Sequence, residues 1–531
     1  MIELPDWLQA LPDAEQQRAT DTWAIETLGT PGIELMERAG AGLADVVALR
    51  VPAGRIVVVC GKGNNGGDGL VAARLLRDAG RDVDVLMLAP GEELGGDART
   101  NFERLPGRPA EPFDPGRLTG AAAIIDAILG TGFAGEPRGP AKGAIAAIVA
   151  AAAADPGAAS GAGGPDRPVV IACDVPSGVD ASTGEVAGAA VRADVTVTFH
   201  AAKPGLWISP GKDHAGEVKV IDIGIPSGAP VHPSVGLING DVVAGIPSRG
   251  RESTKFAAGA VLVCGGSTGL TGAPCLASEA AQRAGAGYVT ALVAASLNYV
   301  FEQRLLEAMS VPLPDIEGAL QPSAAETILE RTQRAGALVL GPGLGRDPAT
   351  FELARAVAAS SEIPLLLDAD GLNAHAGRLG TLAGRHAPAV LTPHAGELAR
   401  LLDVDGDEIA AHRLSSARRA ADEAQAIVVL KGDDTIVAAP DGRAGISRGG
   451  SPALATAGTG DVLSGVVGAY LSKRMDPFHA ACAGVFVHAR AGQLAAARIA
   501  TEGVIARDVI ECLPYARASH DPVAGDQGAE G

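Results

Sequence analysis

The sequence predicts an α/β protein with two domains in tandem, and three observations support this fold class. The chain has 531 residues, which exceeds the size of one typical domain. Short apolar runs alternate with helix-like segments, and many of these runs end in glycine-rich turns. Apolar runs without polar alternation are typical of strands buried on both faces of a parallel sheet. A hydrophobic content of 47% supplies side chains for two cores and excludes a wholly disordered protein.

The first domain is expected over residues 1–228, as a Rossmann-like doubly wound sheet. A strand over residues 55–60 is followed by a helix over 70–79. Further strands are predicted over residues 83–88, 123–127, 168–173, 195–199 and 217–221. The small-residue stretch 151–167 is interpreted as a disordered insertion within this domain. A stretch rich in Pro and Gly, residues 225–233, marks the expected domain boundary.

A second α/β series is expected over residues 235–514. Its strands are predicted over residues 260–264, 288–292, 337–340, 364–367, 389–391 and 426–430. An apolar helix is predicted over 462–471. The polar, glycine-containing tail, residues 516–531, is expected to be disordered.

Charge and composition narrow the class of partners. With 43 basic and 62 acidic residues the net charge is −19, which disfavours a polyanion such as nucleic acid but not a single phosphate ligand. The longest apolar run, residues 144–154, is shorter than the roughly 20 residues of a membrane span. The acidic N-terminus does not resemble a signal peptide, and the six cysteines form no C-x-x-C pair. We therefore expect a cytoplasmic protein that acts on small molecules, without nucleic-acid or membrane partners. A homo-oligomer is also expected, although none of these patterns indicates the oligomeric state.

The turn after the first strand carries an ambiguous motif. It contains G-x-G-x-x-G at Gly61, Gly63 and Gly66, and two acids follow at the distance of a ribose ligand, Asp82 and Asp84. That combination alone would predict a nicotinamide-dependent dehydrogenase. The same turn also holds Asn64, Asn65 and Asp68, whose acceptor oxygens suit a cation or a ribose rather than a pyrophosphate. The alternative is that the asparagines only support turn conformations with positive φ.

Two further turns place acids at predicted strand ends. Asp126 precedes Gly130-Thr131-Gly132, and Asp174 precedes Val175-Pro176-Ser177-Gly178. In open α/β sheets, ligands bind at the carboxyl ends of strands, so these turns are expected to converge with the asparagine turn on one site. Each aspartate taken singly could also be only a helix or turn cap.

Together with the segment Leu35-Met36-Glu37-Arg38-Ala39-Gly40, these turns resemble the NAD(P)H-hydrate epimerase domain, also called the YjeF N-terminal domain, over residues 10–225. Arg38 departs from the asparagine that is common in that family. The resemblance implies interconversion of the R and S epimers of hydrated NADH and NADPH, with Asp174 as an acid or base. It implies a potassium ion bound by Asn65, Asp126 and Ser177. It also implies a substrate held by Asn64, Asn65, Gly66, Gly67, Asp68, Gly130, Thr131, Gly132, Phe133, Ala134, Gly135, Glu136 and Asp174.

A second set of turns lies in the other half of the chain. Ala455-Thr456-Ala457-Gly458-Thr459-Gly460-Asp461 precedes the predicted apolar helix, where backbone amides can face an anion. Asp461 could be a base, or simply a favourable acid in a first helical turn. Three more turns at strand ends are residues 341–345, 368–373 and 392–397, and the last of them contains His394.

These turns resemble the ADP- or ATP-dependent NAD(P)H-hydrate dehydratases, which have a ribokinase-like fold, over residues 240–510. The resemblance implies hydrate binding by Ala273, Gly345, His394 and Asp461, and adenine-nucleotide binding by Lys431, Gly432, Asp433, Asp434, Thr435 and Gly460. Asp461 would deprotonate the hydrate, which is then phosphorylated by ADP with Mg²⁺. The segment Ser253-Thr254-Lys255-Phe256 departs from the family's His-Lys-Gly.

Three functions follow from these patterns. The first is a bifunctional repair enzyme, in which the epimerase supplies the epimer that the dehydratase accepts. The second is a small-molecule kinase that leaves the phosphoryl group on its product. The third is a non-catalytic N-terminal domain that only binds a nucleotide or a partner.

Overall fold

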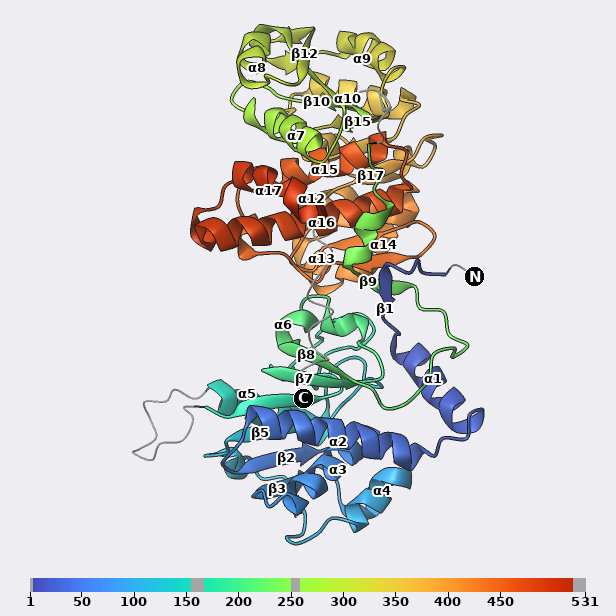
Figure 1. Cartoon of the computed structure of the whole chain (residues 1–531), viewed down its shortest axis with the longest axis vertical. Helices are drawn as coiled ribbons and strands as arrows, with labels where there is room; N and C mark the ends of the chain where they lie inside the picture. The colour runs from blue at the N-terminus through green and yellow to red at the C-terminus, as the bar shows by residue number, and fades with distance from the viewer. Residues whose placement is uncertain (1–2, 154–166, 250–257, 519–531) are drawn as a thin grey trace. The chain divides into compact units, whose positions relative to one another are not determined.

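The computed structural model describes residues 3–153, 167–249 and 258–518, and it divides the chain into two compact units. One unit runs from Ala10 to Ser234, and the other combines the residues up to Gln9 with those from Val235 onward. Both units have the α/β architecture that the sequence predicts (Figure 1). Within the described ranges, none of the helices combines the length and the apolar character that crossing a bilayer requires.

The first unit contains a seven-stranded sheet in which all neighbouring strands are parallel. Its order is β4-β3-β2-β5-β6-β7-β8, so the direction of winding reverses between β2 and β5. The strands are β2 (Ile56–Cys60), β3 (Val83–Met87), β4 (Glu111–Pro112), β5 (Ala123–Ala127), β6 (Val169–Cys173), β7 (Val195–Phe199) and β8 (Glu217–Ile221). Such a reversal leaves a crevice at the carboxyl ends of the strands beside it.

Helices cover both faces of this sheet. They are α1 (Ala14–Glu26), α2 (Gly32–Arg50), α3 (Asn64–Asp78), α4 (Gly96–Glu103), α5 (Gly139–Ala153) and α6 (Gly211–Ala215). Along β2, Ile56 and Val58 join the apolar cluster that contains α2 and α3, whereas Val57 and Val59 join the cluster that contains α5. The doubly wound, Rossmann-like prediction for this half is therefore confirmed.

The second unit contains an eleven-stranded sheet of order β1-β9-β20-β19-β18-β17-β16-β15-β10-β11-β12. Strands β12, β11, β10, β15, β16, β17 and β18 run parallel, and β19 and β20 add antiparallel pairings. The strands are β1 (Leu8–Ala10), β9 (Val235–Ile238), β10 (Ala260–Cys264), β11 (Tyr288–Ala294), β12 (Met309–Leu313), β15 (Ala337–Leu340), β16 (Leu365–Leu367), β17 (Ala389–Leu391), β18 (Ile427–Leu430), β19 (Ile436–Ala438) and β20 (Ala444–Ile446). A separate hairpin joins β13 (Asp315–Ile316) to β14 (Ala319–Leu320).

Helices pack against this second sheet as they do against the first. They are α7 (Gly272–Arg283), α8 (Asn298–Arg304), α9 (Ala325–Thr332), α10 (Pro348–Ser360), α11 (Asp370–Asn373), α12 (Ala395–Leu402), α13 (Gly406–Ala411), α14 (Arg413–Ala424), α15 (Thr459–Ser472), α16 (Pro477–Ile499) and α17 (Ala506–Ala518). Helices α7, α15, α16 and α17 share one large apolar core with strands of the sheet. That core fixes the position of the first turn of α15, which carries Asp461.

The beginning of the chain belongs to the second unit, which differs from the expected first domain of residues 1–228. Leu8 is 4% exposed and lies in the core of the second unit. The Trp7 ring stacks on His479 with a centroid distance of 4.7 Å. The Gln9 amide oxygen accepts a hydrogen bond of 2.6 Å from Arg448. A three-residue strand is too short to show a hydrophobic period, so the sequence offered no signal for this placement.

Several element boundaries also differ from the sequence predictions. Helix α3 begins at Asn64 rather than at residue 70, so the asparagine turn is the first turn of a helix. Residues 151–153 complete helix α5, and residues 516–518 complete helix α17, so these ends of the expected disordered stretches are helical. Residues 154–166 and 519–531 lie outside the described residues, as do Thr254 and Lys255.

Candidate active sites

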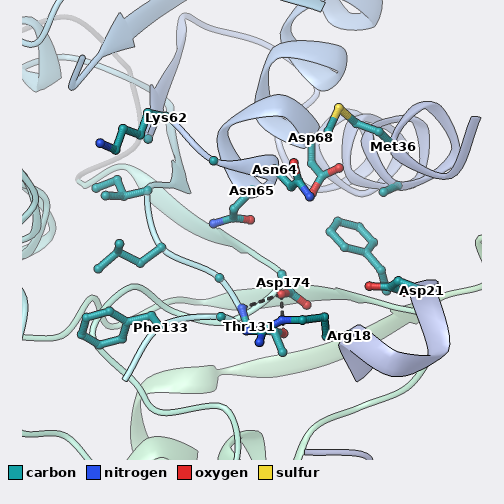
Figure 2. A pocket seen from close by; sticks show the side chains of 18 of the residues that line it. Arg18, Asp21, Met36, Lys62, Asn64, Asn65, Asp68, Thr131, Phe133 and Asp174 are labelled. Atoms are coloured by element: carbon teal, nitrogen blue, oxygen red, sulfur yellow. Dashed lines mark hydrogen bonds between the residues drawn. The ribbon is translucent and has the colours of Figure 1, made fainter. Parts of the chain in front are cut away.

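A cavity of about 810 Å³ lies at the carboxyl end of the first sheet, beside β2, β5 and β6. The turns after these three strands all contribute to its wall, as predicted from their sequences. Figure 2 shows Asn64, Asn65 and Asp68 from the start of α3 together with Asp174 and Thr131. Helix α1 adds Arg18 and Asp21, which the sequence motifs did not indicate.

Asp174 lies directly after β6, with a strained backbone conformation and a carboxylate that is fixed by hydrogen bonds. Its φ is 68°, a conformation that costs about 1 kcal/mol or more for a residue with a side chain. One carboxylate oxygen accepts hydrogen bonds from the Thr131 amide at 2.8 Å and the Thr131 hydroxyl at 2.5 Å. The other accepts from the Lys203 ammonium at 2.8 Å. Burial would raise the pKa of Asp174, but Lys203 and the Thr131 donors outweigh it and hold that pKa below its usual value.

Lys203, like Arg18 and Asp21, is a residue of this site that the sequence motifs did not indicate. It follows β7, is 1% exposed, and also donates to the Thr198 hydroxyl at 2.7 Å and the Phe199 carbonyl at 3.0 Å. All three of its protons therefore have acceptors inside the protein. A lone lysine just past a predicted buried strand was the available signal, because buried lysines are rare unless they are paired.

Asp126 and Ser177, two of the predicted potassium ligands, are in direct contact. The Ser177 amide and hydroxyl donate to the Asp126 carboxylate at 2.8 and 2.6 Å. Both residues are 0% exposed. Burial raises the pKa of Asp126 to about 6, although these hydrogen bonds oppose the shift.

Asn65, the third predicted potassium ligand, has an unsatisfied side chain. Among the described residues, neither its amide nitrogen nor its amide oxygen has a hydrogen-bond partner, and both atoms are buried. A Cβ atom on Gly130 would lie 3.1 Å from Asn65 Cγ and 3.0 Å from the Asp174 carboxylate, so Gly130 keeps this space open. Orphaned buried polar atoms are costly, so the donor set fits a bound ligand such as K⁺.

The remaining residues predicted for this site divide into two groups. Asn64, Asn65, Asp68, Gly130, Thr131, Gly132, Phe133 and Asp174 line the cavity. Gly66 and Gly67 do not, and a Cβ atom there would meet the Gly61 carbonyl at 2.0 Å or Met36 at 2.6 Å. Those two glycines allow the start of α3 to pack closely. Ala134, Gly135 and Glu136 also lie outside the cavity wall, and Glu136 pairs with Lys142 at 2.8 Å.

Asp82 and Asp84, the two acids that would have supported a dehydrogenase, form ion pairs with arginines instead. Asp84 is 4% exposed and is contacted by three guanidinium groups, from Arg55 at 2.9 Å, Arg108 at 2.8 Å and Arg117 at 3.0 Å. Asp82 pairs with Arg108 at 2.6 Å. Neither carboxylate lines the cavity, so neither is placed to bind a ribose there.

In the second unit, Lys431 is the centre of a cluster of charges at the carboxyl ends of β16, β17 and β18. Its ammonium lies 3.0 Å from Asp368 and 3.7 Å from Glu397, both of which are buried. Burial would lower the pKa of Lys431, but the two carboxylates outweigh it and raise that pKa. A Cβ atom on Gly460 would lie 3.6 Å from the Lys431 ammonium, so Lys431 lies beside the start of α15.

Asp461 lies in the first turn of α15, next to this cluster. Burial and the nearby Asp368 carboxylate raise the pKa of Asp461 to about 7, against the opposing effect of Lys431. Gly458, whose φ is 91°, directly precedes helix α15, and no side chain caps the first amides of the helix. Uncapped amides at a helix N-terminus are ready to bind an anion.

His394 caps helix α12 as well as belonging to the cluster. Its Nδ1 accepts hydrogen bonds from the amides of Gly396 at 3.0 Å and Glu397 at 3.3 Å, and the Glu397 carboxylate accepts one from the His394 amide at 2.9 Å. Burial lowers the pKa of His394. Because Nδ1 is an acceptor, the neutral ring carries its proton on Nε2 and can donate from there.

The other residues predicted for the second site lie in neighbouring turns. Gly345 follows β15, and its amide donates to the Asp370 carboxylate at 3.1 Å. Ala273 lies in the first turn of α7, beside Gly343. Asp434 is not free to bind a nucleotide through its carboxylate, because it is buried and accepts from Arg413 at 2.8 Å. The Thr435 hydroxyl closes the turn by bonding to the Gly432 carbonyl at 2.6 Å, and Asp433 is exposed.

His488 is a further half-buried residue near this site that no sequence motif indicated. It lies on α16 and hydrogen-bonds to the backbone of Thr459, at the start of α15. Burial lowers the pKa of His488 to about 4, so the ring is neutral. Its Nε2 atom is buried and has no partner among the described residues.

Comparison with known proteins defines the family of this chain. A family model described as the YjeF-related protein N-terminus matches residues 32–205, and one described as NAD(P)H-hydrate dehydratase matches residues 261–515. The bifunctional NAD(P)H-hydrate repair enzyme of Moorella thermoacetica is 38% identical over 523 residues, covering 95% of this chain and 96% of that protein. The chain belongs to the bifunctional NAD(P)H-hydrate repair enzyme family. The Salinibacter ruber protein of the same name is 37% identical and covers 95% of both chains.

Among solved structures, the chain is similar to the ADP/ATP-dependent NAD(P)H-hydrate dehydratase of Bacillus subtilis, co-crystallised with ATP and Mg²⁺. The identity is 30% and the TM-score is 0.46, over 52% of this chain and 94% of that one. As a member of the repair enzyme family, the chain has one candidate site in each unit. The cavity beside Asp174 lies in the part that matches the YjeF-related family, and the cluster around Lys431 lies in the part that matches the dehydratases.

Proposed function

We propose that this protein repairs hydrated NADH and NADPH in two steps, with the first unit as epimerase and the second as dehydratase. One observation carries the proposal. Each unit brings a carboxylate close to a lysine that follows a strand of its sheet, Asp174 with the buried Lys203 and Asp461, at the start of α15, with the half-buried Lys431. The similarity to bifunctional repair enzymes over 95% of the chain supports assigning both steps to this protein.

In the epimerase step, Asp174 acts as the base toward the hydroxyl on C6 of the hydrated nicotinamide ring. Its lowered pKa keeps the carboxylate ionised at neutral pH. Lys203 and Thr131 fix both of its oxygens, so the carboxylate is oriented before the substrate arrives. The Asn65 amide would hold substrate or cation, because its atoms lack partners among the described residues.

Potassium would be held by Asn65, Asp126 and Ser177. When bound, it would supply positive charge that favours the ionised form of Asp126 and fixes the turns after β2, β5 and β6. The three side chains offer hard oxygen donors, which suit such a cation. Asp126 and Ser177 are already in contact at 2.6 Å, and the Asn65 oxygen is buried without a partner in the described part of the chain.

In the dehydratase step, Asp461 takes the proton of the C6 hydroxyl of the S epimer. The hydroxyl oxygen then attacks the terminal phosphoryl group of ADP, an O–P bond forms, and AMP leaves with the electron pair of the broken P–O bond. Loss of phosphate from C6 and of a proton from C5 to water restores the C5–C6 double bond. A pKa of about 7 suits Asp461 to accept a proton near neutral pH.

The nucleotide is expected at the start of α15. The uncapped amides near Gly460 and the Lys431 ammonium would contact its phosphates. His394 would donate a hydrogen bond from its Nε2 atom to the hydrate. Mg²⁺ would enter with the phosphates, with Asp368 or Glu397 as the neighbouring carboxylates, and would neutralise charge on the transferred group.

One assay tests both steps. Hydrated NADH of both epimers is mixed with ADP, Mg²⁺ and K⁺, and the return of dihydronicotinamide absorbance is followed. We expect complete recovery, with AMP and phosphate released in equal amounts. Recovery that stops at the S fraction would contradict the epimerase step. A phosphoryl group that remains on the product would instead support a small-molecule kinase.

The same assay with a variant separates the two units. Asp461→Asn should lose dehydration while epimer exchange, followed by chromatography of the hydrates, continues. Asp174→Asn should lose epimer exchange while the S epimer is still dehydrated. If either substitution removed both activities without unfolding the protein, the division of labour between the units would be wrong.

A further inference from the structure

Asp68 is a carboxyl group that faces the first cavity without a partner. It lies in the second turn of α3, on the wall of the cavity (Figure 2). In the part of the chain that the structure describes, no hydrogen bond or ion pair reaches its side chain. Asp68 is half-buried, and carboxylates that are largely removed from water are usually paired, so an unpaired one that faces a cavity requires an explanation.

The charges around Asp68 favour its protonated form. Burial and the Asp174 and Asp21 carboxylates raise the pKa of Asp68 well above its usual value. Lys203 opposes this shift, but its three protons are used by Asp174, Thr198 and Phe199. The other charged residues that line the cavity are Arg18, Lys62, Glu93, Asp97 and Arg138. The cavity thus holds two carboxyl groups whose pKa values are shifted in opposite directions, downward for Asp174 and upward for Asp68.

We propose that Asp68 is the proton donor of the epimerase site and that it works together with the Asp174 carboxylate on the hydrated ring. The proposal rests on the epimerase function proposed above and adds a second catalytic residue to it. Two titratable groups whose surroundings push their protonation states apart are the usual arrangement of an acid and a base. Both groups line the same cavity of about 810 Å³, so one substrate can reach both.

The C6 carbon of the hydrate carries a hydroxyl and is bonded to N1, so it can open and close reversibly. Asp174 takes the hydroxyl proton, the C6–N1 bond breaks with its electron pair moving to N1, and Asp68 protonates N1. The product is an open aldehyde whose carbonyl can rotate. N1 then attacks the other face of the carbonyl, returns its proton to Asp68, and the new C6 oxygen recovers a proton from Asp174. Both carboxyl groups end in their original states, and no other reactant is needed.

Asp68→Asn tests this role because asparagine keeps the shape and the hydrogen-bonding ability of a protonated carboxyl but cannot transfer a proton. We expect kcat for epimerisation to fall on the order of 100-fold or more, as general acid catalysis contributes that much, with KM nearly unchanged. The wild-type rate should fall at alkaline pH, where Asp68 ionises, and this alkaline limb should be absent in the variant. Asp68→Glu should recover part of the rate and the limb.

Two further variants complete the test. Asp21→Asn removes one of the charges that keep Asp68 protonated, so the alkaline limb should move to lower pH without disappearing. Asp78→Asn makes the same change on the same helix at an exposed side chain outside the cavity, and should behave as wild type.

A different pattern would overturn the role of Asp68. If Asp68→Asn raises KM but keeps kcat and the alkaline limb, then Asp68 only binds the substrate. If Asp68→Glu and Asp68→Asn are equally slow although both remain folded by circular dichroism, the proton of Asp68 is not used. If the wild-type protein itself does not exchange the epimers, the proposed epimerase function fails instead.

Discussion

The Lys203 ammonium lies 2.8 Å from Asp174, and the two residues follow adjacent strands, β7 and β6, of the first sheet. Lys203 is 1% exposed, so this is a buried ion pair with further hydrogen bonds on both members. The lysine helps to hold the pKa of Asp174 below its usual value against burial, while the pKa of Asp68, in the same cavity, is raised well above its usual value. The buried cation therefore contacts only one of these two carboxyl groups, the one proposed above as the base.

Lys203→Met should move the acidic limb of the pH–rate profile for epimerisation to higher pH. Burial would then raise the pKa of Asp174 without opposition from the lysine, so the base would be protonated over a wider range. In the wild type, the lowered pKa stabilises the fold above the unfolded pKa of about 3.9, and this stabilisation disappears as the pH falls through the folded value. Removing one partner of a buried pair should cost about 3–5 kcal/mol of unfolding free energy.

The measurements for Lys203→Met are the pH profile of epimer exchange and urea unfolding at pH 7. Lys142→Met is a suitable control, because Lys142 forms an exposed pair with Glu136. An acidic limb that stays in place in the Lys203 variant would show that the lysine does not set the state of Asp174.

Potassium should stabilise the first unit in a way that depends on pH and on Asp126. The pKa of Asp126 is raised to about 6, so without a cation the fold loses stability as the pH rises from about 4, the unfolded pKa, through 6. A cation beside the carboxylate should reduce this loss. We expect KCl to raise the thermal midpoint of the first unit at pH 7.5 more than at pH 5, relative to choline chloride. Asp126→Asn should remove the difference between the two salts, and an unchanged difference would exclude Asp126 as a ligand.

Dehydration of the S epimer should accelerate as the pH rises through about 7, where Asp461 ionises. The raised pKa also means that the folded state binds this proton more tightly than the unfolded state, so Asp461 destabilises the second unit once the pH exceeds the unfolded value. Asp461→Asn should therefore abolish dehydration and yet raise the thermal midpoint of the second unit at pH 8. A variant that is inactive and also less stable at that pH would indicate a structural role for Asp461 instead.

The sheet strands of both units could be predicted because parallel strands are buried on both faces and appear as unbroken apolar runs. Residues 123–127 and 195–199 were predicted with the observed bounds. The start of α3 was missed because Gly66, Gly67 and Gly69 have low helix propensity. Their packing explains the helix, since a Cβ atom at Gly69 would lie 2.6 Å from Ala127 on the neighbouring strand. Close tertiary contact overrode local preference there.

The sites were predictable where the residues lie within short motifs and not where their partners are distant in sequence. Asp174 belongs to a recognisable turn at a predicted strand end, and Asp461 belongs to a recognisable turn before a predicted helix. The lysine that pairs with Asp174 lies 29 residues further along the chain, in a turn without a motif. Likewise, Asp434 fell within a predicted nucleotide turn, but its carboxylate is used by Arg413 on helix α14. Pairings of this kind depend on how the strands are ordered in the sheet.

The N-terminal segment provides a final prediction, because it reaches the second unit before the first unit begins. Leu8 is buried in the second core, and Trp7 stacks on His479 and lies 5.8 Å from the Phe478 ring. Trp7→Ala should therefore destabilise the second unit by about 2–3 kcal/mol, below the range for a fully buried tryptophan because Trp7 is half-buried. The matched substitution in the other unit is Trp23→Ala on α1, which packs against the first core. Each variant is heated stepwise, and the remaining dehydration and epimer-exchange activities are measured at each temperature. Trp7→Ala should lose dehydration first, and Trp23→Ala should lose epimer exchange first. If Trp7→Ala lost epimer exchange first instead, the segment would not belong to the second core.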